Sequence, residues 1–103
     1  MSKSRYLDFI PRGRENAVPM KDLARLMDFE PRAVRQWVFN ERRRGVPICS
    51  TTDVIGGGYY LPETADEAAP YIQEQTSRIK SARIALQAVL DYVQEEGAGG
   101  YDG

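Results

Sequence analysis

Apolar residues recur at helical spacing along most of this 103-residue chain. Residues 4–10 predict a short amphipathic helix, which Pro11 and Gly13 end. Residues 20–27 carry Met, Leu and Ala side chains at i, i+3, i+4 and i+7, which predicts a second helix with this stripe in the core. Between the two, residues 12–16 read as a polar connector.

A third helix is predicted over residues 31–44. Pro31 suits its first turn, where a missing N–H costs nothing, and Gly45 suits its C-terminal end. The periodicity places Val34, Val38 and Trp37 on the buried side. The opposite side then carries Arg32, Arg35, Gln36, Phe39, Asn40 and Arg43.

Strand-like composition follows over residues 46–50 and 59–61. Residues 53–58 lie between them and end in three glycines, which tolerate the backbone angles that a hairpin tip requires. We therefore expect a two-stranded wing. A phosphate-binding loop is a poor alternative, because no Gly-Lys-Ser/Thr follows the glycines.

Thr64 and Glu67 form a capping-box pattern that predicts a long helix starting at residue 64 or 65, with a kink or restart at Pro70. Apolar residues then recur every seven positions, which is typical of a helix that packs on another helix. The residues expected to mediate dimerisation are Ile72, Ile79, Ala82, Leu86, Val89 and Val93.

These patterns predict a mainly α fold with a two-stranded β-hairpin wing, that is, a winged helix-turn-helix followed by a long C-terminal helix. The expected organisation is a winged helix-turn-helix domain over residues 4–62, a dimerisation helix over residues 64–96 and a flexible glycine-rich tail over residues 97–103.

Composition is that of an ordinary globular protein, with 42% hydrophobic and 28% charged residues. The chain lacks an apolar run of the roughly 20 residues that cross a bilayer and a secretory signal, so we expect a cytoplasmic protein without membrane contact. It has one cysteine, Cys49, and no histidine, so neither a metal nor another cofactor is expected.

The net charge of −1 conceals an uneven distribution. Residues 1–50 hold 11 Lys and Arg against 6 Asp and Glu, a balance of +5, whereas residues 51–103 hold 3 against 9, a balance of −6. A basic half favours an acidic partner such as DNA, although two solvated faces of one domain would give the same totals.

The helices over residues 20–27 and 31–44 are joined by the turn of residues 28–31, whose Pro31 also begins the second helix. This is the arrangement of a helix-turn-helix whose second helix enters the major groove of double-stranded DNA. Arg pairs with guanine, Asn or Gln pairs with adenine, and Phe39 suits a thymine methyl group. The candidate DNA-binding residues are Arg32, Arg35, Gln36, Phe39, Asn40, Arg42, Arg43, Arg44, Lys21, Thr51 and Thr52.

Each of these assignments has a plainer alternative. The arginine face of the third helix is also compatible with a solvated surface, and an arginine at the helix end can serve as a cap. Thr51 and Thr52 are equally well explained as polar loop residues. Cys49 is expected to be a small buried residue, and the lack of histidine or a serine elbow disfavours an enzyme.

The segments Gly45-Val46-Pro47-Ile48 and Gly58-Tyr59-Tyr60-Leu61-Pro62, together with Val34, Val38 and Arg42, resemble the winged-helix domain of the biotin operon repressor. Over roughly residues 6–95 the chain is also similar to small winged-helix proteins of phages and prophages. The resemblance implies DNA binding through residues 31–44 and the wing, with a regulatory or replication-associated role in the cytoplasm of a bacterial host. Glu41 departs from it, because the repressor-type helix has leucine there, so Glu41 must reach solvent or pair with an arginine.

Two hypotheses follow. The first is a sequence-specific DNA-binding homodimer that places two recognition helices on two half-sites. The second is a protein-interaction module that binds a replication or packaging partner through the acidic C-terminal helix. A monomer in which that helix folds back on the domain is a third arrangement.

Overall fold

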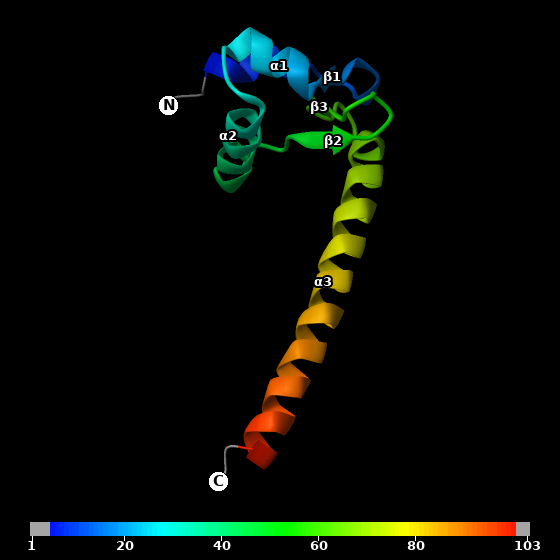
Figure 1. The fold of residues 1–103 in the computed structure, drawn as a ribbon. Coiled ribbons are helices and arrows are strands. Elements are labelled where there is room, and N and C mark those ends of the chain that lie inside the picture. Colours follow the sequence, from blue (N-terminus) through cyan, green and yellow to red (C-terminus); the bar gives the residue numbers. More distant parts are fainter. Residues whose placement is uncertain (1–4, 101–103) are drawn as a thin grey trace. The chain divides into compact units, whose positions relative to one another are not determined.

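The computed structural model describes the backbone of residues 5–100 and the side chains of residues 5–96, and the chain divides into two units at Tyr71 and Ile72. The described residues of the second unit, 72–100, are the remainder of a helix that begins in the first unit. In chain order (Figure 1) the elements are the 3-10 helices η1 (Arg5–Phe9) and η2 (Arg14–Asn16), the strand β1 (Val18–Pro19), the helices α1 (Met20–Met27) and α2 (Pro31–Arg43), the strands β2 (Cys49–Thr51) and β3 (Gly58–Tyr60), and the helix α3 (Ala65–Gly100).

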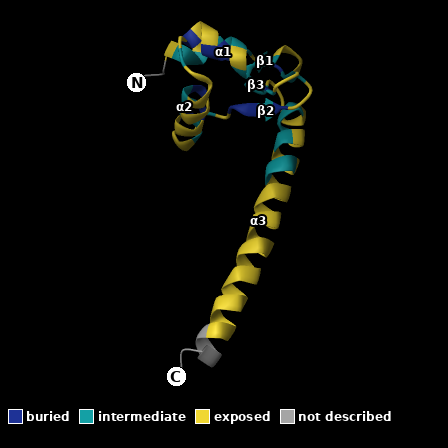
Figure 2. Ribbon diagram, viewed as in Figure 1, coloured by how far each residue is buried: buried dark blue, intermediate teal, exposed yellow. Residues whose placement is uncertain are grey.

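The core of the first unit lies between α1 and α2, as the apolar periodicity predicts (Figure 2). Met20 and Trp37 are only half-buried, but they pack against it. Ile10, directly after η1, and Ile48, in the segment before β2, complete the cluster, because neither helix alone offers more than one apolar stripe. Its buried members are Ile10, Leu23, Ala24, Met27, Val34, Val38 and Ile48.

A tight turn separates α1 from α2. Asp28 takes the left-handed conformation, with φ of 61°, which ends α1 and redirects the chain. The N–H of Phe29 then donates to the carbonyl of Ala24 at 2.9 Å, and the N–H of Asp28 donates to that of Arg25 at 3.3 Å. This bond pattern satisfies carbonyls that the helix leaves open, and it brings the start of α2 directly after α1.

The same bond pattern ends α2. Gly45 has φ of 96°, the N–H of Val46 donates to the carbonyl of Glu41 at 3.0 Å, and the N–H of Gly45 donates to that of Arg42 at 3.0 Å. The predicted role of Gly45 at the C-terminal end is therefore confirmed. A residue with a Cβ would strain this conformation.

The sheet has three strands, not the two that the sequence predicts. β1 pairs antiparallel with β3, and β3 pairs antiparallel with β2, in the order β1-β3-β2. Val18 and Ser50 both face Tyr59 in the register. β1 has only two residues and ends in Pro19, so it is too short to show an alternating pattern in the sequence. It lies at the edge of the sheet, where the missing N–H of proline is tolerated. β2 is shorter than the predicted 46–50, whereas β3 has the predicted three residues but begins and ends one residue before 59–61.

α3 begins after Thr64, as the capping pattern predicts. The N–H of Glu67 donates to Thr64 Oγ1 at 3.3 Å, and Glu67 Oε1 accepts from the N–H of Glu63 at 2.8 Å. The helix runs on without a break through Pro70, so the restart considered there is not observed. It continues to Gly100, whereas a tail was expected from residue 97; residues 101–103 lie outside the described part of the chain.

Two contacts hold the first turns of α3 on the first unit. The buried Tyr60 donates its phenol O–H to the carbonyl of Glu67 at 2.7 Å. The guanidinium of Arg42 lies 5.1 Å from the centre of the Tyr71 ring. These contacts tie α3 to β3 and to the end of α2.

None of the helices in the described part of the chain is both long and apolar enough to cross a membrane.

Candidate nucleic-acid interface

The exposed side of α2 carries the polar residues that the sequence singles out. The buried side is occupied at positions 34, 38 and 41, so residues about half a turn away project outward. Arg32 and Arg35 form no hydrogen bond or ion pair with another described residue, which leaves their guanidinium groups available. The exposed residues of this face, called the α2 face below, are Arg32, Arg35, Gln36, Phe39, Asn40 and Arg43.

Contacts within the α2 face organise it into two adjacent rows. Gln36 Nε2 donates to Asn40 Oδ1 at 3.1 Å, one turn apart. The guanidinium of Arg43 lies 5.7 Å from the centre of the Phe39 ring, and Phe39 itself is 53% exposed. Such contacts hold side chains in place without using the donors of the arginines. The α2 face therefore offers guanidinium and amide groups and one aromatic ring together.

Arg42, a predicted DNA-binding residue, contacts other residues of the first unit with its side chain. It is half-buried, and its Nε donates to the carbonyl of Ile48 at 2.9 Å while its guanidinium lies over Tyr71. Arg44 is exposed, but its Nη1 pairs with Glu41 Oε2 at 3.3 Å. These two arginines thus join the end of α2 to its surroundings, unlike Arg32 and Arg35.

Glu41 is buried with Val34 and Val38, because positions 34, 38 and 41 share one side of the helix. Of the two outcomes expected for it, the pairing with an arginine is confirmed, and the partner is Arg44. Its second oxygen, Oε1, is buried and has no hydrogen-bond partner among the described residues. An unsatisfied acceptor of this kind costs about 1–3 kcal/mol.

The loop that joins β2 to β3, which is the wing expected from the sequence, carries no basic residue. Asp53 pairs with Arg14 at 2.7 Å, so each neutralises the other. Ile55 lies at the tip and is 96% exposed. Ile55 and Arg14 are not among the residues that the sequence predicts for the site; an apolar residue directly before a triple glycine was the available signal for Ile55.

The two threonines of the wing differ. Thr51 is buried, and its Oγ1 accepts from the N–H of Asp53 at 3.1 Å, which is a turn-forming role. Thr52 is exposed and remains accessible to a ligand. Lys21, in the first turn of α1, is also exposed. The structure therefore leaves Thr52 and Lys21 as accessible polar groups outside the α2 face.

Burial raises the pKa of the Cys49 thiol above its ordinary value of 9.0, against the lowering effects of its hydrogen bond with Tyr60 and of the charge on Arg42. Burial, reinforced by Cys49, likewise raises the pKa of the Tyr60 phenol above its ordinary 10.0. Cys49 is thus a protonated thiol near neutral pH, which agrees with the expected buried role.

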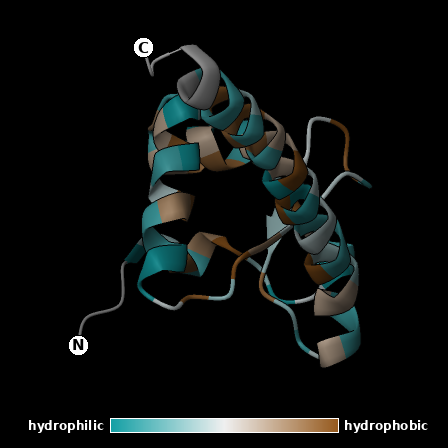
Figure 3. Cartoon of the chain, turned by 90° about the horizontal axis from the view of Figure 1, so that it is seen from below, coloured by the Kyte–Doolittle hydropathy of each residue, from teal (hydrophilic) through white to brown (hydrophobic). Residues whose placement is uncertain are grey.

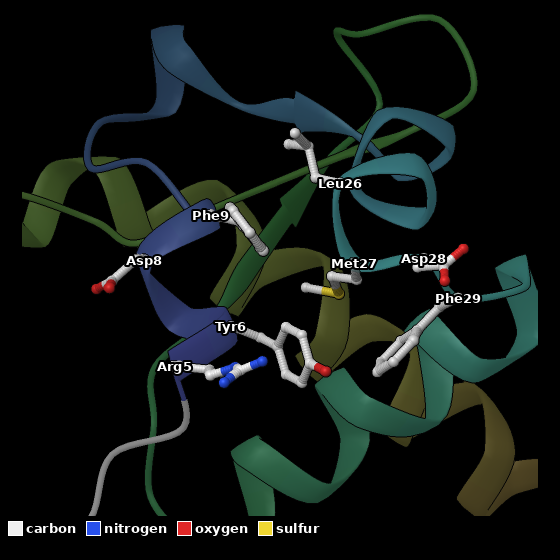
Figure 4. A pocket seen from close by; sticks show the side chains of 8 residues that line it. All are labelled: Arg5, Tyr6, Asp8, Phe9, Leu26, Met27, Asp28 and Phe29. Atoms are coloured by element: carbon white, nitrogen blue, oxygen red, sulfur yellow. The ribbon is translucent and has the colours of Figure 1, made fainter.

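A separate open pocket of about 570 Å³ lies between η1 and the end of α1. Tyr6 and Phe29 point toward one another in it, with ring centres 5.0 Å apart (Figure 4). Its remaining lining mixes Arg5 with Asp8 and Asp28, so it presents no single charge. Among the described residues, no group of three acidic, cysteine or histidine side chains is arranged to hold a metal ion.

All six residues expected to mediate dimerisation are exposed in α3. In comparisons with protein families, curated proteins and solved structures, nothing matches this chain.

Proposed function

We propose that this protein binds double-stranded DNA through the α2 face, as a winged helix-turn-helix protein that acts as a dimer. The observation that carries the proposal is the set of exposed arginines, Arg32, Arg35 and Arg43, beside the amides of Gln36 and Asn40. These are the side chains that read guanine and adenine edges in the major groove. The resemblance to phage and prophage proteins supports a regulatory or replication-associated role in the bacterial cytoplasm.

The arrangement of elements also supports it. α1 and α2 are joined by a tight turn, and α2 is followed by the β2-β3 hairpin. In helix-turn-helix proteins the first helix crosses the DNA backbone while the second lies in the groove. Lys21 and Thr52 are the exposed groups suited to phosphate contacts beside the α2 face.

Replacing Arg35 and Arg43 with alanine tests the proposal. Each arginine that contacts a base or phosphate contributes about 1–3 kcal/mol, so the double variant should bind duplex DNA about 25-fold more weakly, or worse. Fluorescence anisotropy with a labelled duplex selected from a random pool measures this at moderate salt.

A matched control removes the same charge elsewhere. Arg25 is exposed on α1 and already paired with Asp22 at 2.9 Å, and Lys80 is exposed on α3. The Arg25→Ala/Lys80→Ala variant should keep its affinity within about threefold, because it changes only the long-range field. Equal affinity for DNA in wild type and Arg35→Ala/Arg43→Ala would refute the role of the α2 face.

A second candidate function, docking of a protein partner, is favoured by the wing. Its tip presents Ile55, and its one charged residue, Asp53, is acidic. Retention on heparin separates the candidates: a DNA-binding face requires elution only at high salt, and elution at the lowest salt favours docking.

A further inference from the structure

The second unit is a helix with nothing of its own to pack against. The described residues of this unit, 72–100, all belong to α3, and the residues of 76–96 are all exposed (Figure 2). Large apolar side chains are unusually frequent among the exposed residues of 72–96, and exposed apolar surface of this extent marks a contact site. These residues are Ile72, Ile79, Ile84, Leu86, Val89, Leu90, Tyr92 and Val93.

Most of these side chains share one side of the helix, and Figure 3 shows apolar and polar residues alternating along it. Written as heptads, Ile72, Ile79, Leu86 and Val93 fill the a positions, while Ala82 and Val89 fill two of the d positions. The flanking Leu90 and Tyr92 widen this apolar seam toward the C-terminal end. The b positions are all polar, namely Gln73, Lys80, Gln87 and Gln94.

The charges of the helix are segregated along its length. Residues 72–83 hold three basic residues, Arg78, Lys80 and Arg83, against Glu74, a balance of +2. Residues 84–96 hold Asp91, Glu95 and Glu96 with no basic residue, a balance of −3. A parallel pair of these helices would set like charges beside one another at both ends. An antiparallel pair sets each basic half beside an acidic half, within the range where charges are not screened.

We propose that residues 72–96 of α3 bind the same residues of a second copy in an antiparallel pair. The apolar seam supplies the buried contact, and the opposite charges of the two halves select the direction. With full overlap the two Ile72 residues lie about 36 Å apart, at 1.5 Å per residue over 24 residues. If the proposed DNA binding holds, on which this consequence rests, the pair brings two α2 faces into one dimer, as binding to two half-sites requires.

Spin labels at the b positions test the direction of pairing. Gln73, Gln87 and Gln94 each become cysteine in turn, in a Cys49→Ala background, and the label-to-label distance within the dimer is measured by pulsed electron paramagnetic resonance. These positions are polar and off the seam, so the labels leave the apolar contact intact. An antiparallel pair predicts axial separations of about 30 Å at residues 73 and 94 and about 10 Å at residue 87.

Similar short distances at all three positions would mean a parallel pair and would overturn the proposal. Light scattering of the unlabelled wild type gives a second measurement, in which the proposal requires twice 11.6 kDa and a monomer mass contradicts it. DNA affinity does not enter either readout. Failure of DNA binding with the expected distances would therefore refute the proposed DNA binding and leave the pairing intact. DNA binding by a monomer would refute the pairing, and with it the proposed dimer, but would leave the role of the α2 face intact.

Discussion

Glu41 offers the sharpest test of how the first unit is built. Its side chain is only 5% exposed, and its single ion pair is long, at 3.3 Å, with an Arg44 side chain that is 56% exposed. Its Oε1 has no partner among the described residues. The position faces inward beside Val38, so leucine there would bury an apolar side chain in place of a carboxylate.

Glu41→Leu should therefore stabilise the fold. It removes a buried acceptor whose desolvation costs about 1–3 kcal/mol, and it forfeits an ion pair to a half-exposed arginine worth about 0–1 kcal/mol. The expected net gain is about 1–2 kcal/mol in the free energy of unfolding. For a domain of this size each kcal/mol raises Tm by about 4–8 °C.

Urea unfolding followed by fluorescence measures this change, because Trp37 is the one tryptophan of the chain and packs on the core of the first unit. Glu41→Gln is the matched control: it removes the charge but keeps a polar group that needs partners, so little stabilisation is expected. A lower urea midpoint for Glu41→Leu at unchanged slope would show that the carboxylate stabilises the fold and that this reasoning is wrong.

Two further predictions concern stability. Burial raises the pKa of Cys49 and of Tyr60 in the folded state, so their contribution to the free energy of unfolding is complete below the ordinary thiol pKa of 9.0 and is lost as the pH rises through the folded-state pKa values. Urea midpoints measured from pH 7 to 11 should therefore fall above about pH 9, and they should fall less steeply in Cys49→Ala. Gly45→Ala should lower the free energy of unfolding by about 1–2 kcal/mol in the same assay, through the backbone φ of 96° alone, because a Cβ at this position meets nothing within 4 Å. Gly45→Asn should lower it less. Equal stability of the wild type and both variants would show that this conformation is not strained by a side chain.

The three α-helices were predictable because their signals are local, whereas the short 3-10 helix η2 lies in the segment read as a polar connector. The stripe of Leu23, Ala24 and Met27 fixes the buried side of α1, and Thr64 with Glu67 fixes the start of α3. β1 was not predictable, because a strand of two residues is defined by its pairing with β3 and not by any pattern of its own.

The candidate site was predictable in part for the same reason. Helical periodicity alone places Arg32, Arg35 and Arg43 on the exposed side of α2. The inward roles of Arg42 and Thr51 depend on the carbonyl of Ile48, the ring of Tyr71 and the turn of the wing, which come together only in the folded unit.

The salt dependence of duplex DNA binding tests the central claim most directly. Each phosphate neutralised by the protein contributes about −0.9 to the slope of log K against log salt concentration. The guanidinium charges of Arg32, Arg35 and Arg43 on the α2 face neutralise neighbouring phosphates even where their donors also reach base edges, and Lys21 adds a further charge on α1. The wild type should therefore show a slope of about −3 or steeper, and Arg35→Ala/Arg43→Ala a slope shallower by about 2. No binding at the lowest salt, or a slope that the double substitution leaves unchanged, would contradict the account.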